Sequence, residues 1–154
     1  LVGELLDWEV VNMGIAGIGL NPGAAKVLGA LKMNRLVCSI GANDWREGML
    51  PEKFRANLEK FLHDFRAFQP VDFLSPMWLS TKFKAPAAHH TLQEFRDVYA
   101  EFGAECGDPN VRIINGSELI DHDPALYEPD HVHPRDAGIE QLAERLAEQL
   151  MEEL

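Results

Sequence analysis

Hydrophobic positions along the chain form short apolar runs separated by longer segments with a helical period. The apolar runs are rich in β-branched and aromatic residues, and they predict strands. These runs are residues 8–12, 35–41, 71–74 and 111–114. In the other segments, apolar residues recur three or four positions apart, which predicts helices. These segments are residues 24–31, residues 51–68, the stretch that begins at Thr91 and the stretch that follows Pro134.

Local signals support these helices. Pro51 suits a first helical turn, and Thr91 with Glu94 has the spacing of a capping box. The last helix is expected to turn an apolar stripe inward and its acidic residues to solvent. The expected inward stripe is Ile139, Leu142, Leu146 and Leu150.

Strands that alternate with helices predict an α/β fold, a three-layer α/β/α sandwich with a mostly parallel sheet. The chain has no internal repeat and no linker composition, so residues 1–154 are expected to form one domain. In such sheets, ligands bind beyond the carboxyl ends of the strands. The loops at those ends are residues 12–19, 41–45, 75–90 and 115–133.

Two of these loops could hold negative charge on a ligand oxygen. Glycines in the first loop, among them Gly14 and Gly17, let a backbone N–H approach a ligand closely. Asn43 in the second loop offers a side-chain NH₂ donor. The alternatives are a tight strand-to-helix turn for the first loop, and a turn cap made by Asn43 and Asp44 for the second.

The fourth loop carries the pair Asp130 and His133. A carboxylate three residues before a histidine can accept its Nδ1–H, which leaves Nε2 free to act as a base. The alternative is a surface loop in which the histidine only caps the last helix. Metal binding is a rival, with candidate ligands Asp121, His122, Asp123, His131 and His133. Their spacing matches no known zinc pattern, so the sequence predicts no metal site.

The charge of the chain excludes some function classes. A formal net charge of −11 argues against nucleic-acid binding and against docking on anionic lipid. No apolar run approaches the ~20 residues of a membrane helix, and no signal peptide is visible. We therefore expect a soluble protein. The chain begins with Leu1 rather than Met, so both a cytoplasmic location and a secreted form with a processed N-terminus stay open.

Taken in order, three motifs resemble those of the SGNH (GDSL) hydrolase family. They are residues 10–17 (VVNMGIAG), residues 40–44 (IGAND) and the run Asp130-x-x-His133-Pro134. Each stands after the expected strand, and together they span nearly the whole chain. Members of the family are serine esterases, lipases, thioesterases and carbohydrate deacetylases.

The resemblance implies roles for four residues. The backbone N–H of Gly17 and the side chain of Asn43 would line an oxyanion hole. His133 would be the general base, and Asp130 would orient it. The resemblance also implies a small-molecule ester substrate, such as an acyl ester or an acetylated sugar, an acyl-enzyme intermediate and no cofactor.

Aromatic side chains are also expected to wall the substrate pocket. Trp78 and Phe83 lie in the third loop and would suit a short acyl chain or a sugar face. The alternative is that these two side chains form a small core within the loop.

The chain departs from the family at the nucleophile. The family's serine belongs to a Gly-Asp-Ser-Leu-like motif after its first strand, and this chain has no such motif. Its serines are Ser39, Ser75, Ser80 and Ser117, and none stands in a nucleophile turn. We therefore expect an N-terminally incomplete hydrolase whose first strand is absent and whose catalytic serine is not in this chain.

The absent strand is central in the family, so its loss leaves unpaired strand edges. Three outcomes are expected. Another chain fills the gap, as in a homodimer with strand exchange, or residues 8–12 move across to pair with residues 35–41, or the missing residues precede Leu1.

Two rival functions remain open. A non-catalytic binding module could keep the scaffold without the serine. A flavodoxin-like regulatory or nucleotide-binding domain has the same α/β pattern but does not need Asn43 and His133 to converge.

Overall fold

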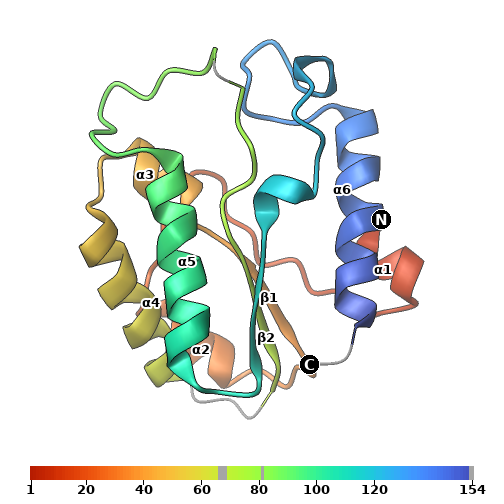
Figure 1. Cartoon of the computed structure of the whole chain (residues 1–154). Helices are drawn as coiled ribbons and strands as arrows, with labels where there is room; N and C mark the ends of the chain where they lie inside the picture. The colour runs from red at the N-terminus through yellow and green to blue at the C-terminus, as the bar shows by residue number, and fades with distance from the viewer. Residues whose placement is uncertain (66–68, 81, 153–154) are drawn as a thin grey trace. The chain divides into compact units, whose positions relative to one another are not determined.

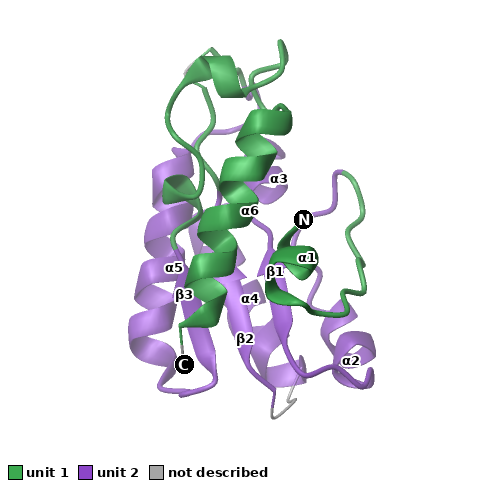
Figure 2. Cartoon of the chain, turned by 90° about the vertical axis from the view of Figure 1, so that its right-hand side faces the viewer, with its two compact units in different colours: residues 1–16, 77–84, 115–153 green, residues 17–76, 85–114, 154 purple. Residues whose placement is uncertain are grey.

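The computed structural model describes residues 1–65, 69–80 and 82–152. The backbone divides into two compact units, which Figure 2 shows in green and purple. Unit 1 comprises residues 1–16, 77–84 and 115–153, and unit 2 comprises residues 17–76, 85–114 and 154.

Unit 2 holds a parallel sheet, in the order β1-β2-β3. Its strands are β1 (Leu36–Ser39), β2 (Val71–Leu74) and β3 (Val111–Ile114). Leu36 lies opposite Val71, which in turn lies opposite Val111. Every residue of the central strand β2 is buried, as is typical of a parallel strand covered on both faces. The α/β prediction and the parallel pairing are confirmed.

Three helices of unit 2 lie where they were predicted, and the fourth, α3, occupies the segment at residues 41–45 that was expected to be a loop (Figure 1). They are α2 (Ala24–Gly29), α3 (Ala42–Arg46), α4 (Pro51–Phe65) and α5 (Leu92–Cys106). The capping box is present at the start of α5, where Thr91 accepts a hydrogen bond from the Glu94 N–H. The predicted helix at 51–68 begins and runs as expected to Phe65, and its last three residues lie outside the described part.

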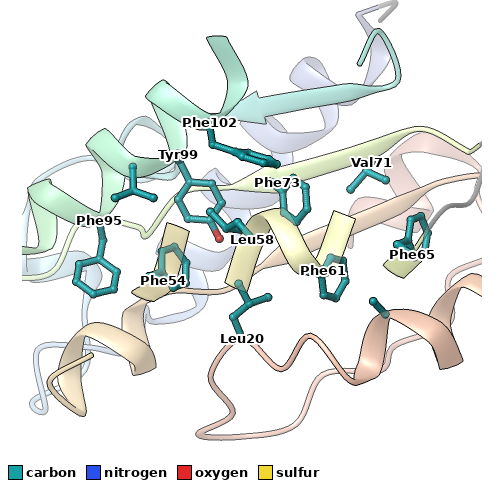
Figure 3. Close-up of a cluster of buried hydrophobic side chains, with 12 residues drawn as sticks. Leu20, Phe54, Leu58, Phe61, Phe65, Val71, Phe73, Phe95, Tyr99 and Phe102 are labelled. Atoms are coloured by element: carbon teal, nitrogen blue, oxygen red, sulfur yellow. The ribbon is translucent and has the colours of Figure 1, made fainter. Parts of the chain in front are cut away.

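The core of unit 2 is an aromatic cluster between these helices and the sheet (Figure 3). Phe54 of α4 meets the edge of Tyr99 of α5, with ring centroids 5.5 Å apart. Phe73 of β2 meets Phe102 of α5 edge-on at 5.9 Å. Each fully buried aromatic side chain contributes roughly 1.5–3 kcal/mol by leaving water, so burial of this cluster stabilises the unit.

The buried carboxylate of Asp72 connects the three strands through ion pairs. Asp72 on β2 has no exposed surface. Its Oδ2 accepts a hydrogen bond from Arg35 Nε at 2.5 Å, and its Oδ1 accepts one from Arg112 Nε at 2.6 Å. Arg35 precedes β1 and Arg112 lies on β3, so one side chain links all three strands.

Unit 1 is helical. Its elements are α1 (Val2–Leu6), the 3₁₀ turns η1 (Gly116–Glu118) and η2 (Pro124–Leu126), and α6 (Asp136–Met151). Helix α1 packs on α6, and η2 lies against the start of α6, where Gly138 leaves no room for a side chain beside the Leu126 carbonyl. No helix in the described ranges combines the length and the apolarity needed to cross a bilayer.

The predicted strand at residues 8–12 is wrong. This segment is irregular, and Val10 and Val11 are 61% and 76% exposed. Strand-forming residues make a strand only where a ladder partner and a packing surface exist. In the described part of the chain, residues 8–12 join no ladder, and all five are exposed. The outcome in which residues 8–12 pair with the next strand is therefore excluded. In the described part of the chain, β1 pairs on one side only, with β2.

The predicted inward stripe of the last helix is wrong at its first position. Ile139 is exposed, whereas Leu146 and Leu150 are buried as expected. The close approach of Leu126 to Gly138 turns Gly138 inward at the first turn of α6. The neighbouring residue, about 100° further round the helix, is thereby left at the surface.

Candidate active site

Asp130 and His133 form a hydrogen-bonded pair in unit 1. Asp130 Oδ2 lies 2.6 Å from His133 Nδ1. Asp130 Oδ1 accepts the backbone N–H groups of Val132 at 2.9 Å and His133 at 3.0 Å. These bonds, the one from the imidazole first, hold the pKa of the Asp130 carboxyl far below its ordinary value. The pair therefore has an ionised carboxylate facing Nδ1 at neutral pH.

The short loop around this pair is shaped by local hydrogen bonds. The His131 N–H donates to the Glu128 carbonyl at 2.9 Å, and His131 takes a left-handed conformation with φ 63°. This turn brings the carboxylate back over the N–H groups that follow it, as an Asx turn does. With its Nδ1–H held by Asp130, a neutral His133 leaves Nε2 as an acceptor, and its side chain is 75% exposed.

In unit 2, Asn43 and Asp44 join α3 to the end of the first of the four loops, residues 12–19, which we call the glycine loop, and to Leu20 directly after it. Asn43 Nδ2 donates to the Ile18 carbonyl at 3.0 Å. Asp44 is buried and accepts the Leu20 N–H with both oxygens, at 2.9 and 3.0 Å. The structure thus places Asn43 beside the residue that follows Gly17. An amide NH₂ has two N–H groups, and the bond to Ile18 uses one of them.

Asp44 anchors α3 to Leu20, a contact that the sequence pattern did not indicate. Burial raises the pKa of its carboxyl, and the N–H of Leu20 opposes that rise. The adjacent amide and carboxylate were visible in the sequence, but they equally fitted a turn cap. Its partner Leu20 lies 24 residues away, so no local pattern indicated the contact.

Two glycines shape this part of unit 2. Gly41 is the N-cap of α3 with φ 113°, and a Cβ there would lie 3.1 Å from Phe54 and 3.2 Å from Pro76. Gly17 has φ 74° and lies in open space. A side chain is strained at both positions, and only at Gly41 would it also meet packed neighbours.

A cavity of about 370 Å³ adjoins Asn43 within unit 2. Its lining residues are Gly19, Asn43, Asp44, Glu47, Gly48 and Met49. The predicted site residues thus fall into two groups, Gly17 with Asn43 in unit 2 and Asp130 with His133 in unit 1. The structure brings each group together, and the convergence of the two groups remains a prediction.

Trp78 belongs to a small aromatic cluster in unit 1. Its ring stacks on His122 at 5.0 Å with an interplanar angle of 12°, and Tyr127 meets it at 5.2 Å. This packing favours the loop-core alternative for Trp78. Phe83 is half-buried, and its N–H donates to the Ser80 carbonyl at 2.9 Å. A substrate-lining role for either side chain remains a prediction.

Three of the four serines of the chain are buried or donate a hydrogen bond from the hydroxyl. Ser75 and Ser80 are buried, and the hydroxyl of Ser117 donates to Asn115 Oδ1 at 2.8 Å. Ser39 is exposed on β1. The Cys38 thiol is disfavoured as a nucleophile, because burial raises its pKa to about 12 and keeps it protonated.

The rival metal site in the fourth loop is not assembled. In the residues that the structure describes, no three His, Cys, Asp or Glu side chains are grouped to hold a metal ion. His122 Nε2 bonds the Ser117 carbonyl, and Asp121 bonds Arg145 and Gln141. Asp123 accepts the Ala125 N–H at the start of η2.

Comparison with known proteins gives one family. The GDSL-like lipase/acylhydrolase family matches residues 1–141. No curated protein matches the sequence of the chain.

Solved structures share the fold at low sequence identity. A salicylyl-acyltransferase from a tetracycline biosynthetic pathway aligns with a TM-score of 0.83 and 20% identity, over 97% of this chain and 46% of its own. A lipase/acylhydrolase from Enterococcus faecalis aligns with a TM-score of 0.78 and 20% identity, over 97% of this chain and 82% of its own. An acetyl xylan esterase from Geobacillus stearothermophilus aligns with a TM-score of 0.75 and 22% identity, over 99% of this chain and 80% of its own. The chain therefore has an α/β sandwich fold, and it spans less than half the length of the acyltransferase.

Proposed function

Because the chain belongs to the GDSL-like lipase/acylhydrolase family, we propose that it is part of a serine ester hydrolase. In this proposal residues 1–154 form a single hydrolase domain that is incomplete at its N-terminus. The nucleophilic serine lies on a segment that precedes Leu1 in the full-length protein. The substrate is a small-molecule carboxylic ester, such as an acyl ester or an acetylated sugar.

The observation that carries this proposal is the 2.6 Å contact between His133 Nδ1 and Asp130 Oδ2. It supports a base whose Nε2 is free and whose ring is held in one tautomer. In the reaction, the serine oxygen attacks the ester carbonyl carbon and its proton passes to His133 Nε2. The carbon–oxygen bond to the alcohol then breaks, and that alcohol takes the proton from His133.

The same groups then hydrolyse the acyl-enzyme in a second step. Water gives a proton to His133 Nε2 as it attacks the acyl carbon, and the serine oxygen leaves with that proton. Gly17 N–H and Asn43 donate to the oxyanion in both steps. Each such donor lowers the barrier by about 2.7–4 kcal/mol where it is aligned. The bond from Asn43 to Ile18 supports this role, because it holds the amide beside the glycine loop.

A fluorophosphonate, which phosphonylates activated serines, tests the proposal through intact mass. The full-length protein is expected to gain one adduct, and the 17.3 kDa chain to gain none. In the full-length protein, His133→Gln is expected to abolish the adduct, whereas His63→Gln, a matched change at an exposed histidine of α4, is expected to retain it.

Two results would contradict the proposal. An adduct on the 17.3 kDa chain would place the nucleophile among its own serines. A full-length protein that gains no adduct would favour the non-catalytic binding module, which is supported by the burial of Ser75 and Ser80.

We further propose that the 154-residue chain by itself forms a homodimer by strand exchange. This is supported by β1, which pairs only with β2 in the described part and exposes Val37. Unpaired strand edges readily take up a strand from another chain. Sedimentation equilibrium is expected to give twice the chain mass, and the monomer mass would exclude the exchange.

A further inference from the structure

A short antiparallel ladder closes the loop at residues 129–132. The Glu128 N–H donates to the His133 carbonyl at 2.7 Å. Beyond it, the Arg135 N–H donates to the Leu126 carbonyl at 2.8 Å. The backbone of His133 is therefore fixed by its pairing with the strand-like segment that precedes the loop.

Tyr127 is the buried member of this ladder. It pairs with Pro134 and is 2% exposed, and no other residue from 121 to 137 is buried. Its hydroxyl donates to the Trp78 carbonyl at 3.0 Å, while its ring meets the Trp78 ring. Trp78 is itself packed, because its ring stacks on that of His122. Tyr127 thus attaches the ladder to a packed part of unit 1.

The side chains of the pair itself have little packing. His133 is 75% exposed and Asp130 is 49% exposed. Their mutual orientation depends on the backbone of residues 130–133, since Asp130 Oδ1 accepts two N–H groups of that backbone. Whatever fixes the ladder therefore also fixes the imidazole.

We infer that Tyr127 is a positioning residue for His133. This inference rests on the proposed function only in taking His133 as the general base. Tyr127 touches neither the substrate nor the reacting atoms. It acts through the ladder, by keeping the Asp130 carboxylate and His133 Nδ1 in register.

The test is Tyr127→Phe, which removes the hydroxyl and keeps the ring. Tyr99→Phe is a matched control, because Tyr99 is also buried and donates to a backbone carbonyl, that of Ile40, at 3.0 Å. Long-range ¹H–¹⁵N NMR of the 154-residue chain reports which nitrogen of neutral His133 carries the proton. This readout needs no enzymatic activity, and Tyr99→Phe accounts for a general loss of stability.

In the wild-type chain we expect the proton on Nδ1. In Tyr127→Phe the ratio of Nδ1–H to Nε2–H tautomer is expected to fall about fivefold, the factor that one lost neutral hydrogen bond gives, and Tyr99→Phe should leave it unchanged. An unchanged ratio in Tyr127→Phe, or an equal fall in Tyr99→Phe, would overturn this inference and would not affect the proposed function. A wild-type His133 that carries its proton on Nε2 would overturn both the inference and the proposed base.

Warming the wild-type chain gives a second measurement that does not depend on the folding of a variant. Below the midpoint of global unfolding, the Nδ1–H tautomer and the ring signals of Tyr127 are expected to change over the same temperature range. A tautomer that is lost while the Tyr127 ring stays fixed would contradict the positioning role.

Discussion

Asp130 holds His133 through both of its carboxylate oxygens, one on the imidazole at 2.6 Å and the other on the backbone N–H at 3.0 Å. The two contacts constrain the ring and the chain that bears it. A carboxylate with only the first contact would leave the loop free to swing. These two hydrogen bonds are the strongest structural support for a base at His133, and they need only four consecutive residues.

In a full-length enzyme that contains the nucleophilic serine, Asp130→Asn is expected to abolish most of the activity and to preserve the fold. The Asn carbonyl oxygen can still accept backbone N–H groups, but the amide NH₂ cannot accept the Nδ1–H. The wrong tautomer then leaves no acceptor at Nε2, and kcat should fall about 10⁴-fold. Steady-state ester hydrolysis by the full-length protein checks this. Asp123→Asn, at a carboxylate that caps η2, should leave kcat unchanged. A similar loss in both variants would contradict the specific role of Asp130.

Gly41→Ala is expected to destabilise the chain much more than Gly107→Ala. Both glycines have positive φ, which costs a side chain about 1–2 kcal/mol. Only at Gly41 would the new Cβ also meet Phe54 and Pro76, whereas nothing lies within 4 Å at Gly107. Overpacking adds roughly 1–3 kcal/mol. Urea denaturation of the two variants should therefore differ by about that amount, and equal losses would show that packing at Gly41 is loose.

Asp72→Ala is expected to reduce the free energy of unfolding by about 3–5 kcal/mol, the loss typical when one partner of a buried ion pair is removed. Arg35 and Arg112 would both lose their shared carboxylate at the sheet. Asp64→Ala removes a carboxylate that bonds the exposed Lys60 on α4 and should cost much less. Chemical denaturation monitored by circular dichroism measures both. Similar losses would indicate that the buried charge does little for stability.

The capping box of α5 should give a measurable dependence on pH. The side chain of His90, and then the backbone and hydroxyl of Thr91, lower the pKa of Glu94 from 4.5 to about 2. A depressed carboxyl pKa stabilises the fold above the ordinary value of 4.5, and this contribution is lost as the pH falls from 4.5 towards 2. NMR titration of the Glu94 carboxyl should show a midpoint near pH 2.

His90→Ala supplies the control for that titration. It removes the largest cause of the shift, so the Glu94 midpoint should move upward toward the ordinary value. A midpoint near 4.5 in the wild-type chain would mean that the box does not hold the ionised carboxylate in solution.

Sequence alone determined the features whose partners are close along the chain. The strands at Val71–Leu74 and Val111–Ile114, the capping box at Thr91 and the pairing of Asp130 with His133 all follow from local patterns. Spacings of two, three or four residues fix which side chains share a face or a turn. Local sequence carries that information directly.

Tertiary structure alone decided the features that depend on a distant partner. Asn43 meets Ile18 across 25 residues, Tyr127 meets Trp78 across 49, and residues 8–12 stay irregular although their composition favours a strand. A strand ladder or a buried contact forms only when the partner segment is present and packed against it. No pattern within one segment specifies that partner segment, and so the support of the candidate site could be found only in the folded chain.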